Sequence, residues 1–242
     1  MKPYLLISTR PEDHLADQER EAFARFGGLD DSELVQLRLE KHPLPAFDPD
    51  QWSGVMLGGS PFDASTPRHL KSQLQLRVEG DIMDLLDIIV PLDFPFLGAC
   101  YGVGTLALHQ GGRIDTLYSE PAGAVTIRLT PEGQSDPLVQ GISTEFRAFV
   151  GHHEACSQLP SNATLLASSA ACPVQMFRIK RNLYGTQFHP ELDVPGFIER
   201  VNQYRTNGYF DDFEAVRTAA LRENNSLAVN RMIANFVKRY AS

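Results

Sequence analysis

A cysteine between two glycines is the segment of this sequence with the clearest chemical meaning. Residues 98–102 read Gly-Ala-Cys-Tyr-Gly and follow a short apolar stretch. The pattern is typical of a nucleophile elbow, a tight strand-to-helix turn that exposes a reactive side chain above the sheet edge. The glycines allow close backbone approach, and free amides at the start of the next helix would stabilise a thiolate at Cys100. A buried structural cysteine before a glycine turn is the alternative interpretation.

A cysteine nucleophile needs a base, and the position of His189 favours it among the seven histidines. An apolar, strand-like stretch over residues 184–188 leads to His189, and Pro190 ends the strand. In an extended chain the side chains of His189 and Glu191 point to the same side, so the carboxylate can orient the imidazole. Taken alone, the pair could also be a strand-end histidine beside a solvated glutamate. With Cys100 it would supply the base that a cysteine nucleophile needs.

Together the two segments resemble the class I, triad-type glutamine amidotransferases, most of all the amidotransferase domain of GMP synthase and its stand-alone relatives. The resemblance runs from about Tyr4 to Glu191. It implies that Cys100 is the nucleophile, His189 the general acid and base, and Glu191 the carboxylate that orients the histidine. It also implies a flavodoxin-like fold and no cofactor.

Two further segments match loops that face the substrate in that family. Residues 57–60, Leu-Gly-Gly-Ser, resemble its glycine-rich oxyanion loop, and residues 151–154, Gly-His-His-Glu, stand where it has a substrate-contacting loop. The alternative for the glycines is an ordinary turn after a strand. The amides of Gly59 and Tyr101 are the expected oxyanion hole, because donors are free on a glycine loop and at a helix N-terminus. The expected oxyanion and substrate-binding residues are Gly58, Gly59, Tyr101, His152 and His153.

Some positions depart from the family pattern. Gly104 replaces the glutamine that usually follows the elbow, Ser60 replaces a common proline, and residues 151–154 replace Ser-His-Gly-Asp. Because glycine has no side chain to donate a hydrogen bond, the resemblance supports the chemistry better than the identity of the substrate. Cys156 and Cys172 match no family motif and are expected to be small core or loop residues.

Strand-like and helix-like segments, which must hold these residues in place, alternate along the first third of the chain. This alternation, with short glycine-rich connections, favours an α/β fold with a mostly parallel sheet and helices on both faces. Strand-like segments then follow one another between residues 124 and 188, which predicts added antiparallel strands. In the first third, strands are expected over residues 4–8, 34–39, 54–57 and 95–99, and helices over 16–26, 70–89 and from 105.

Length and composition suit one large globular domain. The 242 residues, 43% of them hydrophobic, are expected to form a single domain with its core over about 1–192 and a helical C-terminal extension over about 193–242. The last helices, with Tyr209 and Phe210, could cover the active site, contact a partner or complete the core, and completion of the core is the favoured role. No apolar run is long enough to span a membrane or to form a signal peptide, which predicts a cytoplasmic protein without membrane contact.

Charge and cysteine usage exclude several kinds of partner. A net charge of −8 without a run of Lys or Arg argues against nucleic-acid binding. The three cysteines lack a CxxC pair, and no HExxH motif occurs, so neither a disulfide framework nor a metal site is expected.

Three functional hypotheses remain open at this point. In the first, the protein hydrolyses the side-chain amide of glutamine and delivers ammonia to a separate synthase subunit, because the roughly fifty residues after Glu191 leave no room for a synthetase. In the second, it is a stand-alone γ-glutamyl peptidase or hydrolase, which Gly104 favours. In the third, it is a binding or regulatory module on an inactive fold, against which the complete triad argues.

Overall fold

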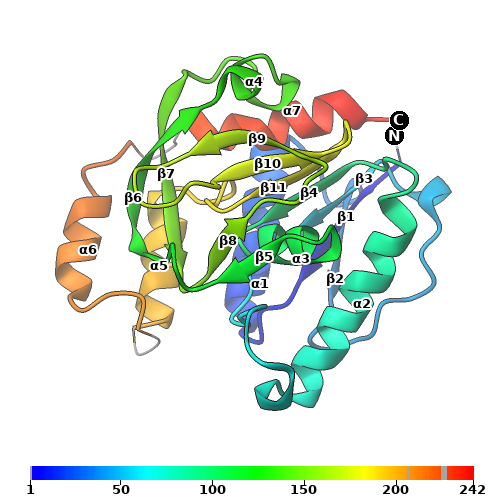
Figure 1. Ribbon diagram of the computed structural model, residues 1–242, viewed down its shortest axis with the longest axis horizontal. Helices are drawn as coiled ribbons and strands as arrows, with labels where there is room; N and C mark the ends of the chain where they lie inside the picture. The colour runs from blue at the N-terminus through cyan, green and yellow to red at the C-terminus, as the bar shows by residue number, and fades with distance from the viewer. Residues whose placement is uncertain (1, 206–207, 225–227) are drawn as a thin grey trace.

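The computed structural model describes residues 2–205, 208–224 and 228–242 (Figure 1). The strands are β1 Tyr4–Ser8, β2 Leu34–Arg38, β3 Gly54–Leu57, β4 Phe96–Ala99, β5 Arg113–Asp115, β6 Glu120–Leu129, β7 Glu145–His152, β8 Ala155–Gln158, β9 Ala163–Ser168, β10 Met176–Ile179 and β11 Leu183–Thr186. The α-helices are α1 Asp13–Gly27, α2 Gln73–Ile89, α3 Tyr101–His109, α4 Pro131–Gln134, α5 Val194–Gln203, α6 Phe213–Ala220 and α7 Arg231–Tyr240.

A single large sheet organises the chain. Its strand order is β2-β1-β3-β4-β11-β10-β9-β6-β7. The strands from β2 to β11 run parallel to one another, and the strands from β10 to β7 continue the sheet in antiparallel pairs. This arrangement confirms the predicted α/β fold, in which antiparallel strands are added to a parallel sheet. No helix in the described ranges is long and apolar enough to cross a membrane.

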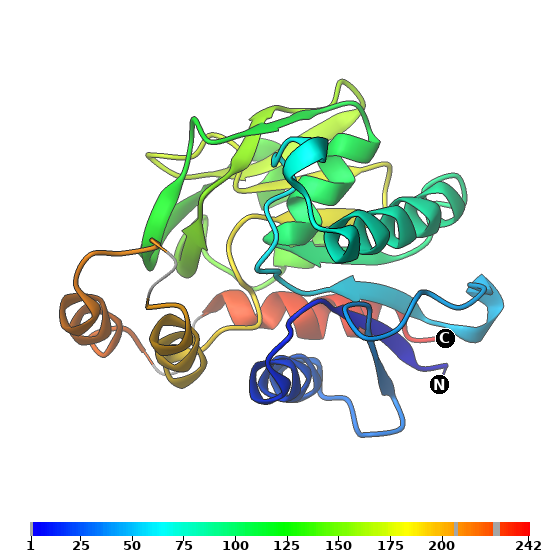
Figure 2. The same ribbon diagram turned by 90° about the horizontal axis from the view of Figure 1, so that it is seen from below.

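Alternating side chains of β1 show why helices cover both faces of the sheet. Tyr4 and Leu6 belong to the core cluster that includes residues of α1, α5 and α7, whereas Leu5 and Ile7 belong to the cluster that includes residues of α2 and α3. Figure 2 shows these two helical layers on opposite sides of the sheet. A strand buried on both faces needs an unbroken apolar run, and residues 4–7 provide one.

The C-terminal helix α7 is part of this core. The hydroxyl of Tyr4 donates a hydrogen bond to the carbonyl oxygen of Val237 over 2.8 Å, and the Phe236 ring lies 6.0 Å from the ring of Tyr4. Near the chain ends, the amide of Lys2 donates to the carbonyl oxygen of Ser242. The expectation that the last helix completes the core is therefore correct for α7.

Three expected helix boundaries were wrong. The helix expected from Ala16 begins at Asp13. The helix expected from Leu70 begins at Gln73, because Ser72 caps it by accepting a hydrogen bond from the amide of Gln75. Leu70 lies outside the helix and its side chain is 67% exposed. The helix expected from residue 105 begins at Tyr101, so its N-terminus lies directly after Cys100.

The elbow between β4 and α3 has the tight geometry that its glycines predict. Cys100 has φ 53° and ψ −89°, a conformation that side-chain-bearing residues rarely adopt. A Cβ atom added at Gly98 would lie only 2.8 Å from the Cα of Gly102 and 2.8 Å from a ring carbon of Phe96. Glycine is thus required at position 98, where strand and helix backbones touch.

The substitution Gly98→Ala should therefore destabilise the fold, with Gly102→Ala as the matched control. The methyl group of an alanine at position 98 would overlap backbone atoms, whereas a Cβ at Gly102 would meet nothing closer than 3.6 Å. We expect a fall in the thermal midpoint on the order of 5 °C for Gly98→Ala, because overpacking of this kind costs about 1–3 kcal/mol. Calorimetry of both variants checks this, and equal midpoints would contradict the steric argument.

Candidate active site

A pocket of about 780 Å³, partly open to solvent, lies where the parallel strands end. Arg10 follows β1, Ser60 follows β3, Cys100 follows β4 and His189 follows β11, and all four residues line the pocket. The carboxyl ends of parallel strands meet along one edge of a sheet, which is the usual place for a ligand site in such folds. Residues far apart in the sequence meet here for that reason.

The structure places His189 in the same pocket as Cys100 and bonds it to Glu191. Cys100 and His189 both line this pocket, and the Nδ1 atom of His189 donates to Oε1 of Glu191 over 2.7 Å. The amide of Cys100 donates to the carbonyl oxygen of Thr186, which ties the elbow to the strand that leads to the histidine. Cys156 and Cys172 are buried and do not line the pocket, as expected for core residues.

Glu191 is fully buried between two partners. Its Oε1 atom accepts from His189 and also from Nη1 of Arg200 over 3.0 Å. Burial opposes ionisation of Glu191, but the charges of His189 and Arg200 and the hydrogen bond from His189 outweigh it and lower its pKa to about 2. The carboxylate is therefore ionised at any ordinary pH, and it fixes His189 with Nδ1 protonated and Nε2 free to act as a base.

Burial has the largest effect on the other two groups as well. It lowers the pKa of His189 below its ordinary value, against the attraction of Glu191, and Arg200 and Arg10 lower it further. Burial raises the pKa of the Cys100 thiol to about 12, and the charge of Arg10 is the strongest influence in the opposite direction. In the resting protein the thiol and the imidazole are therefore both neutral.

An ionic network behind the pocket was not predicted from the sequence. Nε of Arg10 donates to Oε1 of Glu19 over 2.9 Å, and Nη2 of Arg200 lies 3.8 Å from the same oxygen. The hydroxyl of Ser8 donates to the other oxygen of Glu19. In the sequence, only Arg10 could have been picked out as a site residue, because it is a charged residue just after an apolar strand. Glu19 and Arg200 lie on helices, and packing between elements decides which of their side chains are buried.

The two glycines after β3 have different roles in the structure. The amide of Gly58 is bonded to the carbonyl oxygen of Ile7, and a Cβ at Gly58 would lie 2.4 Å from the Glu19 carboxylate. Gly58 is thus required by packing. The amides of Gly59 and Tyr101 have no hydrogen-bond acceptor among the described residues, which leaves them available to an oxyanion.

Glu154 occupies the region beside the unusual Gly104. Its carboxylate accepts hydrogen bonds from the amides of Ala64 and Ser65, over 2.7 and 2.6 Å. A Cβ at Gly104 would lie 3.4 Å from the Ala64 side chain and 3.6 Å from Oε1 of Glu154. The glutamine that the family usually has at this position would therefore compete with Glu154 for the same space.

The expected substrate residues His152 and His153 lie on the pocket wall in different ways. His152 is buried and both of its ring nitrogens are bonded within the protein, Nδ1 to the carbonyl oxygen of Glu154 at 2.9 Å and Nε2 to Glu120 at 3.0 Å. His153 is partly exposed and its ring stacks on Tyr209 at 4.1 Å. Of the two rings, that of His153 is the more exposed, and its Nδ1 atom lies 3.8 Å from a carboxylate oxygen of Asp63.

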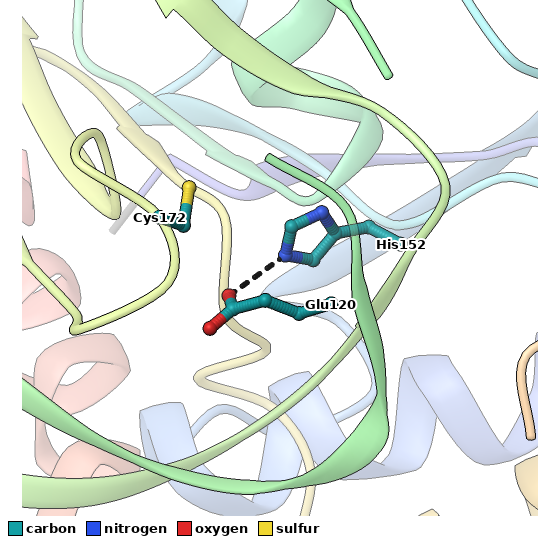
Figure 3. A group of neighbouring side chains, drawn as sticks. All are labelled: Glu120, His152 and Cys172. Atoms are coloured by element: carbon teal, nitrogen blue, oxygen red, sulfur yellow. Dashed lines mark hydrogen bonds and ion pairs between the residues drawn. The ribbon is translucent and has the colours of Figure 1, made fainter. Parts of the chain in front are cut away.

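Glu120, His152 and Cys172 form a buried cluster beside this wall (Figure 3). Their donor atoms lie within 4.8 Å of one another, and Cys, His and Glu are usual ligands of zinc. The groups are nevertheless satisfied without an ion, because Glu120 also accepts hydrogen bonds from Ser169 and Gln175. The cluster explains how the loop that carries His153 and Glu154 is held.

The segment after α5 contributes to the pocket, and Phe210 in addition packs against the core. Tyr204, Tyr209 and Phe210 line the pocket, and the carbonyl oxygen of Tyr209 accepts a hydrogen bond from the amide of Ala122. The C-terminal extension thus supplies part of the pocket wall as well as part of the core. The aromatic residues after α5 pack against the antiparallel strands. The apolar periodicity of the sequence did not reveal this contact.

The low pKa of His189 makes a prediction about pH. The base expected at His189 must be neutral to accept a proton, so activity should be lost as the pH falls through its pKa, which lies below 6.5. We expect kcat/KM to stay high at pH 6.5 and to fall only in more acidic buffer. In Arg200→Gln the acidic limb should move to higher pH, because a positive charge near His189 is removed. A wild-type limb above pH 6.5 would contradict this account.

Comparisons with known proteins agree with the family resemblance seen in the sequence. The model of the family "Glutamine amidotransferase class-I" matches residues 33–195. GMP synthase (glutamine-hydrolyzing) of Hamiltonella defensa is 28% identical over 170 residues, which are 66% of this chain and 29% of that protein. A glutamine-hydrolyzing GMP synthase subunit of Methanobrevibacter smithii is 28% identical over 162 residues, which are 66% of this chain and 74% of that protein.

Solved structures share the fold. A glutamine amidotransferase from Thermotoga maritima superimposes with a TM-score of 0.78 at 19% identity, covering 100% of this chain and 99% of that one. One from Methylobacillus flagellatus gives a TM-score of 0.71 at 19% identity, covering 100% and 94%. The family match spans more than half of the sequence, including Cys100, His189 and Glu191. This chain therefore belongs to the class I glutamine amidotransferase family.

Proposed function

We propose that the protein is a cysteine hydrolase that cleaves the side-chain amide of glutamine through a γ-glutamyl thioester and releases ammonia and glutamate. Cys100 is the nucleophile, His189 the general acid and base, and Glu191 the orienting carboxylate. The observation that carries this proposal is the position of Cys100, on a strained elbow in the same pocket as a histidine bonded to a buried carboxylate at 2.7 Å. Residues 1–242 serve this chemistry as one domain.

In the first half-reaction, Cys100 forms a bond to the amide carbon of the substrate. The proton of its thiol passes to Nε2 of His189, and the carbonyl oxygen becomes an oxyanion held by the amides of Gly59 and Tyr101. The carbon–nitrogen bond then breaks as His189 returns the proton to the leaving nitrogen. The products of this step are ammonia and the γ-glutamyl thioester of Cys100.

In the second half-reaction, water replaces the sulfur. His189 takes a proton from the water as its oxygen attacks the thioester carbon, and the carbon–sulfur bond breaks. The proton passes from His189 to the departing Cys100 sulfur, which restores the thiol and releases glutamate. Glu191 stabilises the imidazolium that exists between the two proton transfers in each half.

A second candidate function is hydrolysis of other γ-glutamyl compounds by the same chemistry. Gly104 favours it, because the glutamine that usually helps to hold the substrate is absent and Glu154 borders the space. In the glutaminase case, a separate synthase subunit is the proposed acceptor of the ammonia.

One assay tests both candidates. The purified protein is offered glutamine and a panel of γ-glutamyl compounds, and glutamate release is measured together with the mass of the acylated protein. Turnover of glutamine supports the first candidate, and a preference for γ-glutamyl peptides supports the second. Absence of any acyl-enzyme and of any turnover would contradict both and favour a binding module on this fold.

A further inference from the structure

We propose that Arg10 forms a carboxylate-binding subsite beside the leaving group, so that the preferred substrates are γ-glutamyl amino acids or peptides whose leaving amine carries a carboxylate. This inference rests on the proposed thioester chemistry of Cys100. It assigns a role to a residue that lies outside the range matched by the family model, which begins at residue 33.

Arg10 is held rigidly but keeps one donor group unused. The residue is 2% exposed and lines the pocket. Its Nε atom donates to Glu19, and its Nη1 atom donates to the hydroxyl of Tyr204 over 3.1 Å. Its Nη2 atom makes no hydrogen bond to any residue in the ranges that the structure describes. A fixed guanidinium with a free N–H edge in a pocket is suited to bind an anion.

The free edge of Arg10 lies close to the group that protonates the leaving nitrogen. A Cβ atom placed on Gly59 would be 2.6 Å from Nη2 of Arg10 and 2.9 Å from Cε1 of His189. Both side chains therefore contact the same point of the Gly59 loop. Cε1 is bonded to both ring nitrogens, and Nδ1 is engaged by Glu191. Nε2, one bond from Cε1, is therefore the ring nitrogen left for a leaving nitrogen in the part of the pocket that Nη2 of Arg10 borders.

This proximity selects one class of leaving group. In an α-amino acid the carboxylate carbon is two bonds from the amine nitrogen, so the carboxylate falls within reach of Arg10 when the nitrogen meets His189. Ammonia, the leaving group of glutamine, has no such group. Another part of the pocket wall carries Asp63 and Glu154, whose negative charges disfavour a carboxylate there. The arrangement therefore orients a γ-glutamyl peptide with its free carboxylate toward Arg10.

Two isosteric substrates test the subsite. γ-Glutamylglycine and γ-glutamylglycinamide differ only in a carboxylate against a neutral amide. We expect the wild-type protein to prefer γ-glutamylglycine by about 10- to 100-fold in kcat/KM, the usual range for a charge-assisted hydrogen bond in a site of this kind. In Arg10→Gln the ratio should fall to about one, and Arg10→Lys should restore part of it. A change in Cys100 reactivity would affect both substrates equally, so it would not change the ratio of their kcat/KM values.

The control is Arg178→Gln, which breaks an ion pair with Asp136 outside the pocket and should leave the ratio unchanged. Should Arg10→Gln fail to fold, Tyr204→Phe removes the hydroxyl that positions Nη1 and should lower the ratio while keeping the charge. A wild-type ratio within about twofold of one, with both substrates hydrolysed, would overturn the subsite and leave the proposed function intact. No turnover or acylation with either substrate or with glutamine would overturn the proposed function, and the subsite with it.

Discussion

The substitution Cys100→Ala should lower the turnover of glutamine and of γ-glutamyl compounds by about ten-thousandfold or more, because it removes the atom that forms the thioester. The fold should be retained, since alanine is smaller than cysteine and the elbow is defined by its glycines. Glutamate release under substrate saturation gives the rate, and the mass of the protein shows whether a γ-glutamyl adduct still forms. The variant should form no adduct at all.

Two other cysteines provide the controls for this experiment. Cys156→Ala tests the loss of a buried thiol that does not line the pocket. Cys172→Ser tests the cluster with His152 and Glu120, which contains the same three residue types as the proposed triad. Both variants should retain turnover and adduct formation. Turnover that survives in Cys100→Ala but disappears in Cys172→Ser would transfer the nucleophile to the other cluster.

The substitution Glu191→Gln should reduce kcat/KM by about a thousand- to ten-thousandfold, as expected when the carboxylate that orients a catalytic histidine loses its charge. The imidazolium formed in each half-reaction would lose its main stabilising partner. Because Glu191 raises the pKa of His189, the remaining activity should show its acidic limb at lower pH than in the wild type. Rates measured as a function of pH separate these two effects.

The same substitution should cost stability, because Arg200 would keep its charge in a buried site without its closest partner. Removing one member of a buried ion pair costs about 3–5 kcal/mol. The pKa of Glu191 is lowered from 4.5 to about 2, so its contribution to folding is present above its unfolded pKa and is lost as the pH falls toward 2. The stability difference between wild type and variant should therefore shrink in acid.

The double variant Glu191→Gln/Arg200→Met separates stability from catalysis. Replacing the unpaired arginine with an apolar side chain should recover much of the lost free energy of unfolding, measured in denaturant. It should not recover the rate, because His189 still lacks its carboxylate. Recovery of activity together with stability would mean that Glu191 serves the fold and not the chemistry.

Much of this site could be predicted because its parts are local in the sequence. The glycines around Cys100 indicate a tight turn, and the short spacing of His189 and Glu191 predicts that the carboxylate reaches the imidazole. The expected extended geometry was wrong, because β11 ends at Thr186 and a turn over residues 190–191 brings the two side chains together. The apolar runs of the parallel strands are equally local, since strands buried on both faces require them. Where boundaries were wrong, as for the helix expected from Leu70, a capping residue at Ser72 decided the start.

The sequence by itself thus determined the α/β fold, the elbow and the residues proposed for the thioester chemistry. Only the tertiary structure decided that Arg10, Glu19 and Arg200 meet behind the histidine, that the ring of His152 is engaged by Glu120, and that residues after α5 line the pocket. The physical reason is that periodicity and turn chemistry act within a few residues, whereas the partner of a buried charge is chosen by packing between elements far apart in the chain.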